Sequence, residues 1–189
     1  MSTIATPADF RYPWYMQFIF WRQRRRYGHE LEPVRLWGRI PGAFPAMAAM
    51  YRALDRRASP IEPALRALVQ VRVSQINWCE FCVDLNSSIG LGRGVSAGKF
   101  EALARFEESG LFTEREKAAL RYAEAITRTD RRVDDEVISR LHGHFDDQAI
   151  VELAALIAYQ NMSSKFNAAL GVPAQGFCRL PDHPAQPNH

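Results

Sequence analysis

Cys79 and Cys82 are the residues of this chain whose type and spacing most clearly predict chemistry. They follow a long segment with apolar residues at helical spacing, and we expect a new helix to begin at the first of them. The N-terminus of a helix carries partial positive charge and free N–H groups, which favour a thiolate over a thiol. Two sulfurs three residues apart can also join without a large backbone movement. The pair therefore predicts a reactive dithiol.

Three other roles compete with a reactive dithiol. A structural zinc site needs four protein ligands, but Cys178 lies far along the chain and nothing in the sequence brings His142 or His144 close. A thioredoxin-like site would follow a strand in a βαβ unit, and no such unit is predicted. The two cysteines could simply be small apolar residues buried between helices. Their spacing and the helix start favour the redox role, with no metal and no cofactor.

Composition narrows the class of protein. The chain has 189 residues, of which 47% are hydrophobic, enough for one domain with an appendage. A formal net charge of +3 is too small to predict a nucleic-acid partner. Three cysteines are an odd number for a secreted disulfide scaffold. The N-terminus lacks the residue order of a signal peptide, and no apolar run is long enough to span a membrane. We therefore expect a cytoplasmic protein.

Helical periodicity and capping residues predict an all-α fold. The expected helices cover about residues 13–27, 45–57, 59–76, 79–90, 96–106, 113–126, 134–142 and 148–170. Ser59 with Glu62, and Thr113 with Glu116, have the spacing of capping boxes. Residues 29–44 are expected to be irregular, residues 90–94 to form a hinge-like loop, and residues 174–189 to be extended or disordered. No segment has the alternation of a strand.

Residues 13–27 combine early aromatic residues with late arginines. One interpretation is a patch that binds a membrane surface or an acidic partner. The other is an arm whose aromatic side chains cover the main domain or a neighbouring subunit. We favour the arm, because exposed aromatic residues on this scale usually mark protein contacts.

Residues 65–84, with the sequence LRALVQVRVSQINWCEFCVD, closely resemble the core of the carboxymuconolactone decarboxylase / alkylhydroperoxidase D (AhpD) family. Residues 111–120 look like the family's next helix, and the final helix, with residues 159–167, is similar to its closing element. The resemblance extends over about residues 40–173 and is most specific around the cysteine pair. It divides the chain into an N-terminal extension (1–39), an AhpD-like domain (40–173) and a C-terminal tail (174–189).

The resemblance implies an all-helical bundle that forms homo-oligomers, often trimers or hexamers. It also implies a thiol–disulfide oxidoreductase or peroxidase of the peroxiredoxin type. Cys82 would attack a hydroperoxide and become a sulfenic acid, and Cys79 would resolve it to a disulfide. A dithiol reductant, either a protein or a small molecule, would restore the reduced form. The family's decarboxylase branch lacks this dithiol, so we do not expect decarboxylation.

Two positions depart from the family pattern. The proton relay of the family has a glutamate twelve residues before the first cysteine and a histidine four residues after the second. This chain has Ala67 and Asn86 there. Neither side chain can act as a base near neutral pH, and losing a general base typically costs about 10²–10⁴-fold in rate. We therefore expect weakened peroxidase activity, or alternatively a non-catalytic oligomer that binds a small molecule or a protein.

Other groups could compensate for the missing relay. Glu80 and Asp84 are close in sequence, but helical spacing does not place them where the missing groups would be. His142 and His144 could supply a base from another helix, although a solvent-exposed helix end is the favoured interpretation. Arg72 lies at the edge of an apolar stripe, where it could extend to solvent or face the dithiol.

Overall fold

The computed structural model describes residues 2–7 and 9–178, and those residues contain only helices, turns and extended segments. The elements are α1 (Trp14–Tyr27), α2 (Glu32–Trp37), α3 (Ala43–Leu54), α4 (Pro63–Ile76), α5 (Glu80–Gly92), α6 (Ala97–Ala102), the 3-10 turn η1 (Leu103–Arg105), α7 (Glu114–Thr127), α8 (Asp135–His142) and α9 (Asp147–Ala169). The fold is all-α, as predicted. Within the described ranges, no helix is both long and apolar enough to cross a bilayer.

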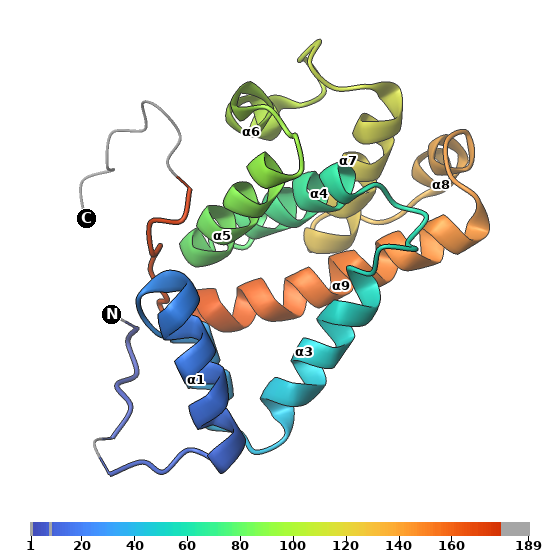
Figure 1. The fold of residues 1–189 in the computed structure, drawn as a ribbon. Helices are drawn as coiled ribbons and strands as arrows, with labels where there is room; N and C mark the ends of the chain where they lie inside the picture. The colour runs from blue at the N-terminus through green and yellow to red at the C-terminus, as the bar shows by residue number, and fades with distance from the viewer. Residues whose placement is uncertain (1, 8, 179–189) are drawn as a thin grey trace.

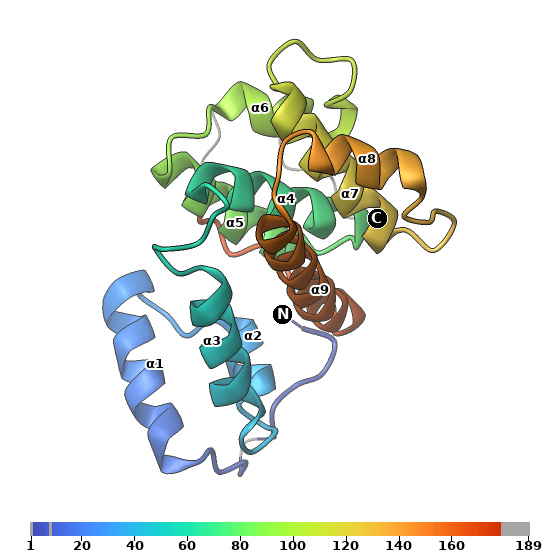
Figure 2. The same cartoon turned by 90° about the vertical axis from the view of Figure 1, so that its right-hand side faces the viewer.

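The long helix α9 separates two groups of helices (Figures 1 and 2). Helices α4 to α8 lie on one side of it, and α1 to α3 lie on the other. The main apolar core forms where α4 packs against α5, α7 and α9. Leu68, Leu120, Leu153 and Ile157 are fully buried there. Burying such side chains stabilises the fold by roughly 1.5–3 kcal/mol each.

Three of the predicted helix starts are present. Thr113 and Glu116 form the predicted capping box at α7. The side chain of Asp134 accepts a hydrogen bond from the backbone N–H of Val137 at α8, and Asp146 does the same for Ala149 at α9. A side-chain oxygen at the N-cap satisfies a backbone donor that has no partner within the helix.

The predicted capping box at Ser59 is wrong. Helix α4 begins at Pro63, four residues later, and Ser59 Oγ instead donates to a carboxylate oxygen of Glu152 at 2.9 Å. Glu152 also pairs with Arg56, so this part of the loop is fixed to α9. The hydrogen bond from Ser59 to Glu152 therefore forms in place of the predicted helix cap.

Two segments are more regular than expected. Residues 32–37, predicted to be irregular, form α2, which begins with Pro33 in its first turn. The predicted loop at residues 90–94 is also wrong in part, because α5 continues to Gly92. Gly90 is needed inside this helix, since a Cβ there would lie 2.5 Å from the ring of Phe100 and 3.1 Å from Cβ of Ala67.

Candidate active site

The first cysteine of the pair lies at a helix-to-helix junction built around Trp78. Helix α4 ends in a Schellman motif, in which the N–H of Cys79 donates to the carbonyl of Ser74 and that of Trp78 to the carbonyl of Gln75. Trp78 therefore occupies the left-handed position that glycine usually takes, with φ of 55°. Its side chain is 87% exposed and gains little from packing. This junction holds the backbone of Cys79 in place for the next helix.

Cys79 is the N-cap of α5, and its Sγ accepts a hydrogen bond from the backbone N–H of Cys82 at 3.2 Å. The two cysteines are joined in a disulfide, with their Cα atoms 5.3 Å apart. That Cα separation lies within the ordinary range for disulfides. The structure therefore brings the two predicted site residues together at a helix N-terminus. There the backbone N–H groups would stabilise a thiolate once the bond is reduced.

Asn167 provides a polar contact to the second cysteine. It lies in the last turn of α9 and is 1% exposed, and its Nδ2 donates to Sγ of Cys82 at 3.3 Å. Its Oδ1 atom is buried without a hydrogen-bond partner among the described residues. A donor aimed at the sulfur favours the charged form of the thiol. The sequence pattern gave no signal for this role, because the contact joins residues 85 positions apart.

The disulfide is covered by the N-terminal helices. Cys79 is 1% exposed and Cys82 is 3% exposed. They belong to a second apolar cluster whose other buried members are Met16, Phe20, Leu31, Val34, Leu36, Phe81 and Val172. Gly38 allows α1 to approach α2, since a Cβ there would lie 2.6 Å from the end of Met16. The predicted arm therefore packs against the dithiol region of its own chain.

The segment after α9 adds to this cover. The carboxylate of Asp84 accepts backbone hydrogen bonds from Gln175, Phe177 and Cys178 at 2.8, 3.1 and 2.6 Å. Phe177 packs edge to face on Phe81, which lies between the two cysteines. Residues 174–178 of the tail, predicted to be extended or disordered, are thus ordered on α5. Residues 179–189 lie outside the described part of the chain.

Both positions that depart from the family pattern are buried. Ala67 is 1% exposed and faces Gly90 where α4 and α5 touch. Asn86 is 7% exposed and lies one helical turn after Cys82. A glutamate at position 67 would have to enter a close helix contact. The absence of a relay at this position is therefore built into the packing of the two helices.

The other candidate groups lie elsewhere. Arg72 donates from Nε to Glu124 at 2.8 Å and from Nη1 to Gln75 at 3.1 Å, so its guanidinium is held at α7. His142 is about half exposed at the end of α8, beside Asp147. This favours the helix-end interpretation of the histidines. In the ranges that the structure describes, no three metal-binding side chains converge.

A ladder of buried and half-buried polar side chains joins α4 and its C-cap to α9 next to the site. Gln160 donates to Ser74, while Asn77 donates to Asn161 and Ser164 at 2.9 and 2.8 Å. These contacts fix the end of α4 and hence the junction that carries Cys79. Buried polar networks of this kind specify one register between packed helices.

Comparison with known proteins places this geometry among related folds. A family model described as "Carboxymuconolactone decarboxylase family" matches residues 41–125. The uncharacterized protein YnjA of Escherichia coli K12 is 46% identical over 162 residues, covering 86% of this chain and 89% of YnjA. A peroxidase-related protein from Ralstonia eutropha JMP134 with an alkylhydroperoxidase AhpD core has a TM-score of 0.80 at 20% identity, covering 93% and 94% of the two chains. The debrominase Bmp8, solved as a cysteine-to-alanine variant with 2,3,4-tribromopyrrole, has a TM-score of 0.74 at 22% identity, covering 86% and 87%.

Proposed function

Because the chain belongs to the carboxymuconolactone decarboxylase / AhpD-like family, we propose that it is a thiol-dependent oxidoreductase that reduces organic hydroperoxides. The observation that carries this proposal is the Cys79–Cys82 disulfide at the N-terminus of α5, with Asn167 donating to the sulfur of Cys82. Cys82 is the attacking thiol and Cys79 the resolving one.

The first step converts the hydroperoxide to an alcohol. The thiolate of Cys82 attacks the terminal oxygen of ROOH, the O–O bond breaks, and Cys82 becomes a sulfenic acid while RO⁻ leaves. The leaving alkoxide takes a proton from solvent and departs as ROH. Asn167 and the N-terminus of α5 stabilise the thiolate before attack.

The second step forms the disulfide seen in the structure. The thiol of Cys79 attacks the sulfur of the sulfenic acid, an S–S bond forms, and the oxygen leaves as water. An external dithiol then reduces the disulfide by two exchange steps and is itself oxidised to a disulfide. Each cycle thus consumes one hydroperoxide and one dithiol.

Both reactants need an opening of the cover. Cys79 and Cys82 are at most 3% exposed beneath α1, α2 and residues 172–178, so neither a hydroperoxide nor a dithiol can reach their sulfurs in this conformation. The chemistry therefore requires a movement of these segments. Slow opening, together with Ala67 and Asn86 in place of a relay, predicts a low turnover.

Turnover with a dithiol donor tests the proposal. The reduced protein should consume cumene hydroperoxide in the presence of dihydrolipoamide, and Cys82→Ser should abolish consumption. Cys79→Ser should consume about one equivalent of hydroperoxide per subunit without steady turnover. Cys178→Ser serves as a control that keeps the pair intact. Unchanged consumption by Cys82→Ser would refute the proposal.

The alternative is a non-catalytic binding protein of the same family. The tight contact of Ala67 with Gly90 and the burial of both sulfurs favour it. It predicts that the reduced protein consumes no hydroperoxide even after residues 2–30 are removed. Bmp8 shares only the fold at 22% identity, so its tribromopyrrole ligand assigns no substrate to this chain. Cytoplasmic location and a trimeric or hexameric state remain predictions.

A further inference from the structure

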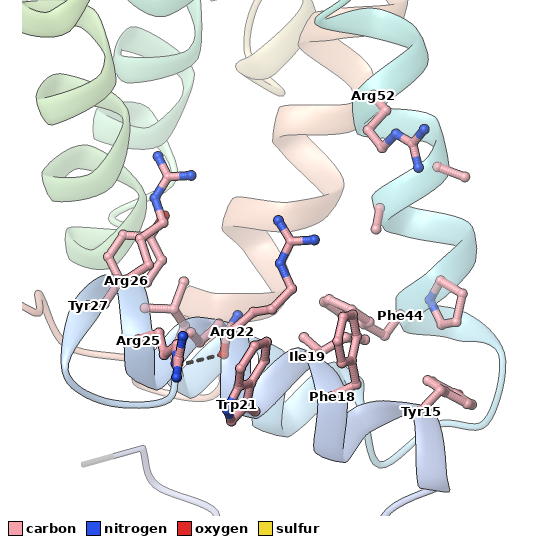
Figure 3. A pocket seen from close by; sticks show the side chains of 15 residues that line it. Tyr15, Phe18, Ile19, Trp21, Arg22, Arg25, Arg26, Tyr27, Phe44 and Arg52 are labelled. Atoms are coloured by element: carbon pink, nitrogen blue, oxygen red, sulfur yellow. Dashed lines mark hydrogen bonds between the residues drawn. The ribbon is translucent and has the colours of Figure 1, made fainter.

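A groove between α1 and α3 lies outside the proposed thiol chemistry. It has a volume of about 930 Å³, which is within the range of small-molecule pockets. The two helices start close together and diverge toward their C-terminal ends (Figure 1). Phe18, Ile19 and Phe44 meet toward the narrow end, and Arg22 extends from α1 toward the wide end (Figure 3). Arg52 lines the groove from α3. The groove thus has an apolar part and a cationic part.

The cationic part is not neutralised by the protein. Arg22, Arg25, Arg26 and Arg52 line the groove, and no carboxylate of the described residues forms an ion pair with any of them. The neighbouring carboxylate, Glu30, is held by Arg24 and Arg35 instead. Arg22 and Arg26 are one helical turn apart, a spacing at which like charges destabilise a helix. The dipole of α1 favours cations in its last turn, but it does not explain why Arg52 of α3 lines the same groove.

The apolar part of the groove contains aromatic side chains that remain largely exposed, which also indicates a binding site. Phe18 is 58% exposed and Trp21 is 45% exposed, although both lie on a helix that packs against the protein. Every residue of α3 retains some exposure. Adjacent exposed aromatic residues of this kind mark either a protein contact or a ligand-binding groove.

A second copy of this chain fits the groove poorly. A two-fold contact with its axis through the groove would place the same four arginines of each copy near one another. Such a contact would bring like charges together without a described carboxylate to offset them. An anionic occupant avoids this repulsion, and an apolar chain on that occupant would cover the aromatic residues.

We propose that the α1–α3 groove binds a long-chain carboxylate, with the chain on Phe18, Ile19 and Phe44 and the carboxylate between Arg22 and Arg52. Guanidinium groups bind carboxylates through two parallel hydrogen bonds. Each additional buried methylene of the chain should strengthen binding about fourfold, until the apolar part is filled. Ile19 and Phe44 also pack on the cluster around the cysteines, so the occupied groove would hold α1 in place over the dithiol.

Binding can be tested without any thiol chemistry. Dansylaminoundecanoic acid is titrated into the oxidised protein, and its fluorescence is followed. Carboxylates of eight to fourteen carbons are then used as competitors, with the matching alcohols as controls. We expect carboxylates to compete at least tenfold better than alcohols and to improve with length. Equal competition by alcohols would overturn the proposal. The result is independent of peroxidase turnover, so either proposal can fail alone.

Two pairs of variants locate the site. Arg22→Glu with Arg52→Glu should weaken probe binding more than tenfold, whereas Arg57→Glu with Arg132→Glu changes the same charge at exposed sites outside the groove and should not. Ala49→Trp should fill the groove, and Ala46→Trp places the same ring on an exposed position of α3 that does not line it.

Unchanged probe binding in both groove variants would place the probe elsewhere and overturn the proposal. Size-exclusion chromatography with light scattering tests the other occupant. If the double reversal of Arg22 and Arg52 separated an oligomer into monomers without weakening the probe, the groove would be a subunit interface. That outcome would also overturn the proposal.

Discussion

At the scale of single residues, the site differs from its family pattern in which side chains provide polar groups near the cysteines. The sequence shows that Ala67 and Asn86 cannot relay a proton, and this conclusion needs only their chemistry. It does not show Asn167 at Cys82, because that contact depends on how α9 crosses α5. The dithiol was therefore predictable from local spacing, whereas its polar neighbour was not.

Replacing Asn167 should raise the pKa of the Cys82 thiol. Asn167→Leu removes the donor at 3.3 Å, and Asn167→Asp puts a negative charge beside the sulfur, so the aspartate should raise the pKa further. A one-unit rise lowers the thiolate fraction about tenfold at any pH well below the pKa. Iodoacetamide alkylation against pH, in a Cys79→Ser background, measures this. Gln148→Leu is the control, since it removes an exposed amide at the opposite end of α9, where Gln148 contacts Glu152. Identical pH profiles would remove Asn167 from the account.

Restoring the family glutamate should not restore a relay. Ala67→Glu would introduce a carboxylate where Cβ of residue 67 already faces Gly90. We expect a loss of at least about 2 kcal/mol in the free energy of unfolding, from overpacking and burial of a charge. Urea denaturation and the hydroperoxide assay measure the two effects. A more active variant of unchanged stability would contradict this view of position 67.

At the scale of elements, helix starts with local caps were predictable and those set by tertiary contacts were not. Thr113 caps its helix as its spacing from Glu116 indicates, and Asp134 and Asp146 cap the two helices that follow. Ser59 has equally suitable spacing, but Glu152 of α9 takes its hydroxyl group. Likewise, the glycines at 90, 92 and 94 predicted that α5 ends near residue 90. Gly90 instead lies inside the helix, where its lack of a side chain leaves room for the ring of Phe100.

Asp55 should be a strong link between elements. Its carboxylate accepts from Arg66 of α4 at 2.9 Å and from Arg93 after α5 at 2.5 Å, and the side chain of Arg66 is only 4% exposed. Asp55→Asn would leave Arg66 buried without its counter-charge, and we expect a loss of about 2–4 kcal/mol in the free energy of unfolding at pH 7. Glu114→Gln, on an exposed carboxylate, is the control. Equal unfolding midpoints in urea would contradict this role.

The same link should appear in the pH dependence of stability. Burial disfavours the charged form of Asp55, but hydrogen bonds and attraction from Arg93 and Arg66 outweigh it and lower the pKa of Asp55. A lowered folded pKa gives stability that is present above the unfolded pKa and is lost as pH falls through the folded value. The difference between wild type and Asp55→Asn should therefore shrink below about pH 4, measured by urea denaturation. A difference that stays constant to pH 2 would argue against this titration.

At the scale of the whole molecule, the segments before α4 and after α9 close over the dithiol. The sequence predicted an aromatic arm but left open whether it covers its own domain or a neighbour. Met16 and Phe20 of α1 are buried in the cluster that contains both cysteines, so α1 covers its own domain. The tail was less predictable, because its order depends on three backbone groups that converge on one carboxylate, Asp84.

Loosening this cover should speed reduction of the disulfide. Asp84→Asn weakens the hydrogen bonds to residues 175–178, since a neutral amide oxygen is a poorer acceptor than a carboxylate. We expect reduction by dithiothreitol to be about three- to tenfold faster, because movement of the covering segments limits the rate of that reaction. Asp147→Asn, on an exposed carboxylate far from the tail, should leave the rate unchanged. A rate unaffected by Asp84→Asn would mean that the tail does not limit access.

The most direct measurement is the fate of Cys82 after one exposure to hydroperoxide. The Cys79→Ser protein is reduced, mixed with one equivalent of cumene hydroperoxide and dimedone, and digested for mass spectrometry. We predict a dimedone adduct at Cys82, and in wild type a Cys79–Cys82 disulfide in its place. An unmodified Cys82 thiol, with the hydroperoxide unconsumed, would contradict the account.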